Sequence, residues 1–434
     1  MIRYLCDTDF YNRSKIYGAD STEMRMDMQI IDGGVNAPKG YEASGVEAGI
    51  KYENRKDMAL VYTKEAASVA GTFTTNVVKA APVVWDKEVV ESGKSVHAVV
   101  LNSGIANAAT GKEGKEYNYE MASEIAKVLD VLPEEVLTAS TGVIGMQLRM
   151  EPIRKGAPLL KEALTTERDG AIAAAEAIMT TDTTRKECAV TFEQEGRTIT
   201  VGGMSKGSGM IHPNMATMLS VITTDAKVSP ETLQEMLGSI VKDSFNMISV
   251  DRDTSTNDTC LLLANGAAGA EEIKMDSKEY EALYEAVSYV ATELAKKMAA
   301  DGEGCTRLLE VTVKGAKTKE EAVILSKSVI SSNLVKTAIY GKDANCGRVL
   351  CALGYAGVDF DPEVVDLTLY AGGEELVWIE NGVLTDFSEE KATEMMGNDV
   401  VTLVCNMKQG DAEATAWGCD LTYDYIKINA DYRS

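Results

Sequence analysis

The sequence is most informative between residues 206 and 219, where it reads Lys206-Gly-Ser-Gly-Met-Ile-His-Pro-Asn-Met-Ala-Thr-Met-Leu219. Glycines and a proline shape a loop that ends at the small residue Ala216 and at Thr217, whose β-branched side chain restricts χ1. The following residues are apolar and β-prone, and they predict a buried strand over 218–224. A hydroxyl held in one direction beside an open carbonyl is suited to attack the carbonyl carbon of Ala216 and to cleave the chain before Thr217.

Cleavage at this bond would make Thr217 a new N-terminus. Its α-amine, with an ordinary pKa of about 7.7–8.0, would then lie beside its own hydroxyl as a general base. The alternative interpretation is a surface loop that enters a buried strand, which is the usual meaning of an isolated Ala-Thr pair. The context over 206–219 favours the cleavage site.

The composition indicates a globular protein whose partners are not polyanions. Of the 434 residues, 45% are hydrophobic and 25% are charged, and the net charge is −24. Nucleic acids and anionic membranes require clustered Lys and Arg, and no apolar run approaches the ~18–20 residues of a membrane span. The eight cysteines show no C-x-x-C spacing and nothing resembles a secretory signal, which favours a cytoplasmic location. The two histidines, His97 and His212, argue against a metal site and against a histidine-based triad.

The order of periodic segments predicts an α+β protein with layered mixed sheets and helices. A hairpin is expected over 188–203, and residues 1–27 resemble an N-terminal extension that we exclude from the fold. The other expected elements are strands at 58–63, 69–73, 97–102, 259–264, 308–314, 334–340, 365–370 and 375–378, helices at 114–129, 157–178, 230–244, 276–300 and 318–330, and a final strand over 421–428.

The segment around Thr217 resembles the site at which the ornithine acetyltransferase family of arginine biosynthesis (bifunctional glutamate N-acetyltransferase) is cut autocatalytically. The resemblance runs from about Gly33 to Ser434 and includes further motifs at 75–76, 80–83, 102–104, 140–145, 179–183 and 429–434. It implies an N-terminal-nucleophile-like architecture and two chains of similar size. Residues 28–216 would form an alpha chain, and residues 217–434 a beta chain that begins at the nucleophile.

The resemblance assigns the oxyanion hole to Thr141 and Gly142, which lie in the segment Ser-Thr-Gly-Val-Ile-Gly. Acyl transfer develops negative charge on the carbonyl oxygen, and preorganised donors aimed at that oxygen stabilise it. A threonine hydroxyl and a glycine amide would supply two such donors. The alternative interpretation is a tight turn between a strand and a helix.

The resemblance assigns substrate binding to Thr180, Lys206, Thr217, Glu303, Asn429 and Ser434. An ammonium group suits a substrate carboxylate, and a carboxylate between two glycines suits a substrate amine. Each assignment has an ordinary alternative. Thr180 could belong to hydroxyls that stop a helix, and Lys206 could be a solvated lysine. Glu303 could lie at a helix C-cap, and Asn429 and Ser434 could belong to a frayed chain end. Spacing does not decide which of Thr180, Thr181 and Thr183 faces the substrate.

The resemblance implies a ping-pong acetyltransferase. Thr217 would take acetyl from N²-acetylornithine, release ornithine and pass the acetyl group to glutamate, giving N-acetylglutamate without a cofactor. Use of acetyl-CoA as a second donor stays open, and the implied assembly contains two alpha and two beta chains. Two alternatives remain: an N-terminal-nucleophile amidohydrolase or aminopeptidase that uses water as the acceptor, and an unprocessed ligand-binding protein.

Three stretches depart from the family pattern. Ile105 stands where the family often has Asn, Arg252 stands where it usually has Gly, and residues 343–348 lack the usual Pro and Trp. A bulky cation in place of glycine could alter a loop near the site.

Overall fold

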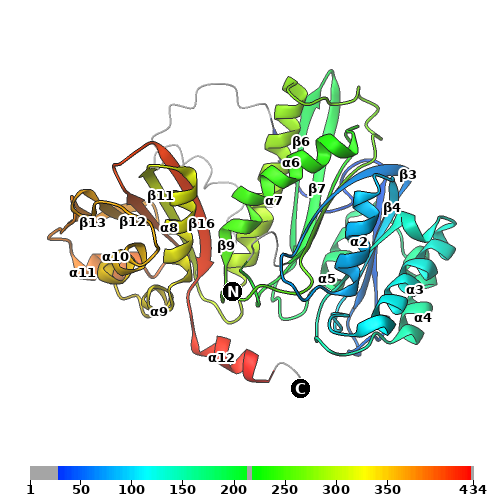
Figure 1. The fold of residues 1–434 in the computed structure, drawn as a ribbon, viewed down its shortest axis with the longest axis horizontal. Coiled ribbons are helices and arrows are strands. Elements are labelled where there is room, and N and C mark those ends of the chain that lie inside the picture. The colour runs from blue at the N-terminus through cyan, green and yellow to red at the C-terminus, as the bar shows by residue number, and fades with distance from the viewer. Residues whose placement is uncertain (1–27, 213–217, 432–434) are drawn as a thin grey trace. The chain divides into compact units, whose positions relative to one another are not determined.

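The computed structural model describes residues 28–212 and 218–431, which form two compact units (Figure 1). The large unit contains residues 28–246, 213–217 excepted, together with Asp253–Met298; the small unit contains Met247–Arg252 and residues 299–431. Both units include residues of the predicted beta chain, so the units do not divide at residue 217. Cleavage of the chain into two pieces stays a prediction, and the suspected extension 1–27 lies outside the described residues.

The described part of the large unit is built on a nine-stranded mixed sheet. Its strands are β1 (Gln29–Ile31), β2 (Tyr41–Val46), β3 (Met58–Phe73), β4 (Val96–Asn102), β5 (Val136–Ser140), β6 (Lys186–Gln194), β7 (Arg197–Lys206), β8 (Leu219–Thr224) and β10 (Thr259–Ala264). Their order is β1-β6-β7-β8-β10-β3-β4-β5, and β2 also pairs with β3. The pairs β8–β10 and β4–β5 are parallel, which makes the sheet mixed.

The strands on either side of residue 217 are neighbours in this sheet. The expected hairpin is present as β6–β7, and the strand expected after Thr217 is β8. Strand β8 pairs antiparallel with β7 from Lys206↔Leu219 to Val201↔Thr224, and it pairs in parallel with β10 on its other side. The first strand of the predicted beta chain therefore lies inside the sheet, next to the last strand of the predicted alpha chain.

Strand β3 corrects the expectation of two separate strands at 58–63 and 69–73. The exposed residues 64–66 interrupt the apolar pattern, but the strand continues through them. Its first half pairs with β2 and β4, whereas its second half, from Ser68, pairs with β10. The two apolar runs are thus the two pairing segments of one long strand that joins both parts of the sheet.

Helices cover the sheet layers of the large unit (Figure 1). They are α2 (Ala81–Glu91), α3 (Gly111–Leu129), α4 (Met150–Glu162), α5 (Arg168–Ala177), α6 (Pro230–Asp243) and α7 (Lys278–Ala300). Side chains alternate along β3, so Met58 joins a core with α3 and α4, while Ala59 joins a second core shared with β7, β8 and β10. On β7, Gly203 lets α7 approach, because an added Cβ would lie 3.0 Å from Leu294. The expected α+β class with layered mixed sheets and helices is confirmed.

The single helix expected over 157–178 is two helices, α4 and α5, so that expectation was wrong about continuity. Between them, Thr165 and Ala43 of β2 exchange two backbone hydrogen bonds of 3.0 and 3.2 Å. The side chain of Asn36 also donates to the carbonyls of Thr165 and Glu167. These partners lie more than 100 residues away in sequence, so the helical periodicity of residues 157–178 could not reveal the interruption.

The described part of the small unit contains a second mixed sheet, with the order β14-β13-β12-β15-β11-β16-β9. Its elements are β9 (Ile248–Ser249), β11 (Leu308–Ala316), β12 (Asp366–Ala371), β13 (Glu374–Glu380), β14 (Val383–Leu384), β15 (Val400–Asn406), β16 (Ala412–Cys419), α8 (Lys319–Ser331), α9 (Asn333–Gly341), α10 (Cys346–Gly354), α11 (Glu389–Met395) and α12 (Tyr423–Ala430). Helix α8 packs on β11 and β16.

Two segments of the small unit are helices where strands were expected. Residues 334–340 lie in α9, whose first turn is capped by the hydroxyl of Ser332 as it accepts from the amide of Val335 (3.4 Å). Residues 421–428 lie largely in α12, where the hydroxyl of Thr422 accepts from the amides of Asp424 and Tyr425. In both cases a capping hydroxyl directs a short apolar segment into a helix, which the apolar alternation alone did not reveal.

None of the described helices is by itself long and apolar enough to cross a membrane. One bent pair, α8 and α9 at 55° to each other, satisfies the same criteria of length and composition only when its two helices are counted together.

Candidate active site

The proposed oxyanion segment leaves the sheet where two parallel strands end. Strands β4 and β5 finish in register at Asn102 and Ser140, and the hydroxyl of Ser140 donates to the side-chain oxygen of Asn102 (2.6 Å). The amide of Thr141 then donates to the carbonyl of Asn102 (3.0 Å), and the amide of Val143 donates to the carbonyl of Gly104 (3.1 Å). These bonds hold the backbone on both sides of residue 142 against the loop that follows β4.

Gly142 occupies a position that no other residue fits. Its φ is 129°, and an added Cβ would lie 2.2 Å from the carbonyl carbon of Gly104. Within the described residues its amide donates no hydrogen bond, and the residue is half-buried. An amide without an acceptor beside a threonine hydroxyl is what an oxyanion hole requires before the substrate arrives.

Lys206 brings three of the sequence-predicted residues together. Its ammonium donates to the hydroxyl oxygen of Thr180 (2.9 Å) and to that of Thr141 (3.4 Å). The residue is the last of β7 and only 7% exposed, so the alternative of a solvated lysine in a flexible loop was wrong. The buried ammonium thus lies between the proposed oxyanion threonine and the proposed substrate threonine.

The structure distinguishes the three threonines that spacing left undecided. The hydroxyl of Thr180 accepts a hydrogen bond from Lys206. The hydroxyl of Thr181 instead shares a 2.7 Å hydrogen bond with that of buried Ser208, and Thr183 is exposed.

Asp182 organises this cluster, and sequence reasoning missed it. One carboxylate oxygen accepts from the ammonium of Lys186 (2.6 Å) and from the amide of Gly207 (2.7 Å); the other accepts from the amide of Thr180 (3.0 Å) and lies 3.9 Å from the ammonium of Lys206. Burial alone would raise the pKa of Asp182, but the two lysines and these hydrogen bonds hold it well below its usual range. The sequence signal was a single acid among four threonines at 180–184, four residues before Lys186.

The loop before β10 supports the site from another side. The side chain of Asn257 donates to the carbonyls of Ser140 (2.7 Å) and Ala106 (2.6 Å), so it fixes the residue that precedes Thr141. Burial raises the pKa of neighbouring Asp258 well above its usual range, against hydrogen bonds from Ser255 and Thr74 and the charge of Lys206. The polar run 254–259 directly before a buried strand could have indicated both residues.

The small unit brings Glu303 and Asn429 together. The side-chain amide of Asn429, in α12, donates to the carboxylate of Glu303 (2.7 Å), which is buried. The hydroxyl of Thr422 donates to the carbonyl of Gly304 (2.7 Å), so α12 is fastened to the loop that carries Glu303. These contacts hold α12 in place, and the carboxylate of Glu303 contacts a side chain instead of only capping α7.

The sequence-predicted residues thus fall into two groups. Thr141, Gly142, Thr180 and Lys206 form one cluster in the large unit, and Glu303 and Asn429 form a pair in the small unit. Ala216, Thr217 and Ser434 lie outside the described residues. Chemically, the cluster combines a cation, two hydroxyls and an available amide, a set that can bind a carboxylate and stabilise a developing oxyanion.

Comparison with known proteins gives a consistent result. The family model described as the ArgJ family matches residues 42–434. The arginine biosynthesis bifunctional protein ArgJ of Caldanaerobacter subterraneus subsp. tengcongensis is 49% identical over 94% of this chain and all of its own length. The glutamate N-acetyltransferase of Methanocaldococcus jannaschii is 46% identical over 93% of this chain and all of its own length. A solved chain of ornithine acetyltransferase from Mycobacterium tuberculosis, in complex with ornithine, is 38% identical over 44% of this chain and all of its own, with a TM-score of 0.40.

Proposed function

The chain belongs to the ArgJ family, and on that premise we propose that it transfers an acetyl group from N²-acetylornithine to glutamate, giving ornithine and N-acetylglutamate. The observation that carries the proposal is the contact of Lys206 with both Thr141 and Thr180. The loop that leads to Thr217 begins directly after Lys206. Relatives named for arginine biosynthesis and for glutamate N-acetylation support the choice of substrates.

The proposed reaction has two half-reactions at one nucleophile. The hydroxyl of Thr217 attacks the acetyl carbon while the α-amine of Thr217 takes its proton. Thr141 and Gly142 stabilise the oxyanion, and the same amine returns the proton to the departing ornithine nitrogen. The amine of glutamate then attacks the acetyl-threonine ester in the reverse sense, which regenerates Thr217. The ester stores the acyl group, so the proposal includes no cofactor; acetyl-CoA as an additional donor stays open.

The charge of the cluster supports an anionic group on the substrate. Lys186 and Lys206 carry two positive charges, and Asp182 carries one negative charge. The ammonium of Lys206 contacts both candidate hydroxyls, so the α-carboxylate shared by acetylornithine and glutamate would bind beside a positive charge.

The sheet supports an association of the two chains after cleavage. The backbone pairing of β8 with β7, and of β10 with β3, joins residues on both sides of position 217 and does not depend on that peptide bond. The alpha and beta chains are therefore proposed to remain together, in an assembly of two alpha and two beta chains. A cytoplasmic location remains part of this proposal.

Acceptor dependence tests the proposal. Ornithine release from acetylornithine should depend on glutamate at steady state, and N-acetylglutamate should form in equal amount. Release at the same rate without glutamate, and without N-acetylglutamate, would instead identify the hydrolase that uses water as acceptor. An intact chain with no turnover would identify the ligand-binding protein.

Thr141→Ala should lower kcat by roughly 10²–10³ with little change in substrate binding, because one of two oxyanion donors is lost. The matched control is Thr181→Ala, which removes a hydroxyl that contacts Ser208 and not Lys206. Steady-state kinetics of both variants measures the difference. Wild-type kcat in Thr141→Ala would mean that residues 140–145 are only a turn.

Lys206→Ala should raise KM roughly 10- to 100-fold for acetylornithine and for glutamate alike, because a charge-assisted bond to the shared α-carboxylate is lost. Lys64→Ala, on an exposed part of β3, is the control. Varying each substrate in turn gives both KM values. An effect on one substrate alone would contradict a common carboxylate site. Whether Glu303, Asn429 and Ser434 serve the same substrate stays a prediction.

A further inference from the structure

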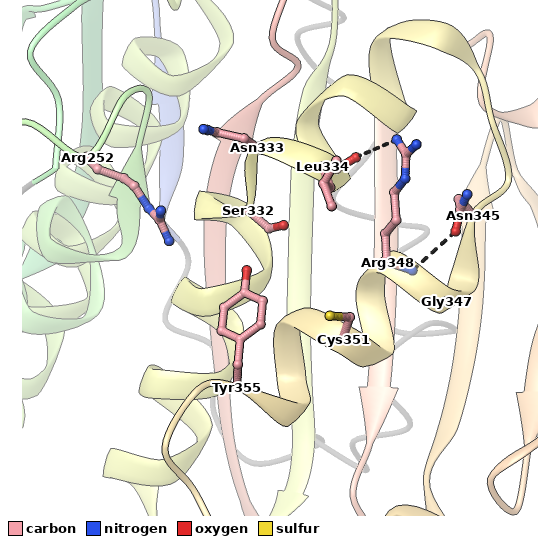
Figure 2. A pocket seen from close by; sticks show the side chains of 9 residues that line it. All are labelled: Arg252, Ser332, Asn333, Leu334, Asn345, Gly347, Arg348, Cys351 and Tyr355. Atoms are coloured by element: carbon pink, nitrogen blue, oxygen red, sulfur yellow. Dashed lines mark hydrogen bonds between the residues drawn. The ribbon is translucent and has the colours of Figure 1, made fainter.

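The small unit contains a pocket of about 340 Å³ to which no role has been assigned above. It lies between the start of α9 and the helix α10 (Figure 2). Two stretches that depart from the family pattern, Arg252 and residues 343–348, both contribute to it. Its lining residues are Arg252, Ser332, Asn333, Leu334, Asn345, Gly347, Arg348, Cys351 and Tyr355.

The lining is cationic in an otherwise acidic protein. It contains two guanidinium groups and, among the residues that line it, no carboxylate, although the whole chain has a net charge of −24. Figure 2 shows the two arginines on opposite sides of the pocket, with Ser332 and Leu334 between them. Such a surface attracts small anions by its local field.

Arg348 is one fixed wall of the pocket. Its guanidinium donates to the carbonyl of Leu334 (2.9 Å) and, at 3.4 Å, to the hydroxyl of Thr337. Its second terminal nitrogen lies 4.0 Å from a carboxylate oxygen of Asp343, so its charge is partly compensated. These contacts hold the group in place before any ligand arrives.

Arg252 is the second cation of the pocket, and the described residues form no ion pair with it. Its φ is 72°, in the left-handed region that is unfavourable for residues other than glycine, and it is exposed. Its side chain extends toward Ser332 and Tyr355 (Figure 2), and within the described part of the chain its guanidinium has no acceptor. A guanidinium without a partner on a strained backbone position is free to form a bidentate pair with a ligand.

We propose that this pocket binds a small organic anion with a carboxylate or phosphate group. The acidic group pairs with the guanidinium of Arg252 and is hydrogen-bonded by the neighbouring hydroxyls of Ser332 and Tyr355. The body of the ligand lies against Leu334 and the ring of Tyr355. The volume is at the lower end of the range for small-molecule sites, which suits a metabolite-sized ligand. The argument for this site does not rest on the acetyl transfer proposed above.

Titration calorimetry on the full chain at constant ionic strength tests the inference. The probes are succinate, inorganic phosphate and succinamide, which is the neutral isostere of succinate. We expect saturable binding of succinate or phosphate with a Kd below about 1 mM, and no binding of succinamide. The tighter of the two anions identifies a carboxylate or a phosphate as the ligand group.

Arg252→Gly is the decisive variant, because glycine relieves the left-handed backbone and so should keep the fold. We expect anion binding at least about tenfold weaker and a Tm no lower than that of the wild type. Lys342→Gly is the matched control: it also removes a cation from a left-handed position (φ 54°) of the small unit, outside the pocket. This control should bind the anion as the wild type does.

Three outcomes would overturn the inference. The wild type could bind neither succinate nor phosphate, or it could bind succinamide as well as it binds succinate. The third outcome is that Arg252→Gly binds the anion as well as the wild type does. If Lys206→Ala then loses binding, the anion lies at the candidate active site. None of these outcomes depends on whether acetyl transfer is observed.

Discussion

Thr217→Ala is expected to yield one full-length chain without acetyltransferase activity. The alanine side chain has no hydroxyl to attack the carbonyl of Ala216, and without cleavage there is no N-terminal amine to act as base. Wild-type protein should instead run on a denaturing gel as two fragments of nearly equal length, residues 1–216 and 217–434. Sequencing of the second fragment should begin at Thr-Met-Leu-Ser.

Thr217→Ser is the matched control for this experiment. It keeps the hydroxyl but loses the β-branch that restricts χ1, so cleavage and turnover should be slower and not absent. A wild-type chain that remains intact while it transfers acetyl would refute the maturation scheme. Activity at the wild-type level in Thr217→Ala would do the same.

Asp182→Ala is expected to destabilise the large unit by about 3–5 kcal/mol, because it leaves the fully buried ammonium of Lys186 without its carboxylate. The amides of Gly207 and Thr180 lose their acceptor in the same change. Urea unfolding in the uncleaved Thr217→Ala background measures the loss. Asp32→Ala removes an exposed carboxylate that pairs with Arg168, and should cost under about 1 kcal/mol. Equal effects of the two variants would contradict the assigned role of Asp182.

The carboxylate of Asp182 should also make the unfolding free energy depend on pH in a defined direction. The folded pKa of Asp182 is lower than the unfolded value of about 3.9, so its ionised form stabilises the folded state above that pH. This contribution is lost as the pH falls through the folded pKa. The loss of unfolding free energy caused by Asp182→Ala should therefore be constant near neutral pH and shrink below about pH 4. A loss that grows on acidification would contradict this assignment.

Much of the fold was predictable from local patterns because those patterns reflect the backbone itself. The strand at 259–264 and the helix at 230–244 agree with β10 and with α6, whose start is marked by the capping hydroxyl of Ser229 and by Pro230. The errors at 334–340 and 421–428 fell on short apolar segments, which satisfy helical and strand periodicity about equally well. The interruption between α4 and α5 depends on Asn36 and β2, partners that local periodicity does not contain.

The candidate site shows the same division. The sequence by itself determined the reactive groups: the threonine hydroxyls, the glycine at 142, the lysine at 206 and the predicted cleavage point, because these are chemical identities and their order along the chain. Only the tertiary structure decided that the hydroxyl of Thr180 contacts Lys206, and that Asp182 holds both lysines. The physical reason is that burial and pairing depend on groups from the loop after β5, from β7 and from the loop after α5, which are far apart in sequence. Their charges, pKa values and available donors are therefore properties of the folded arrangement.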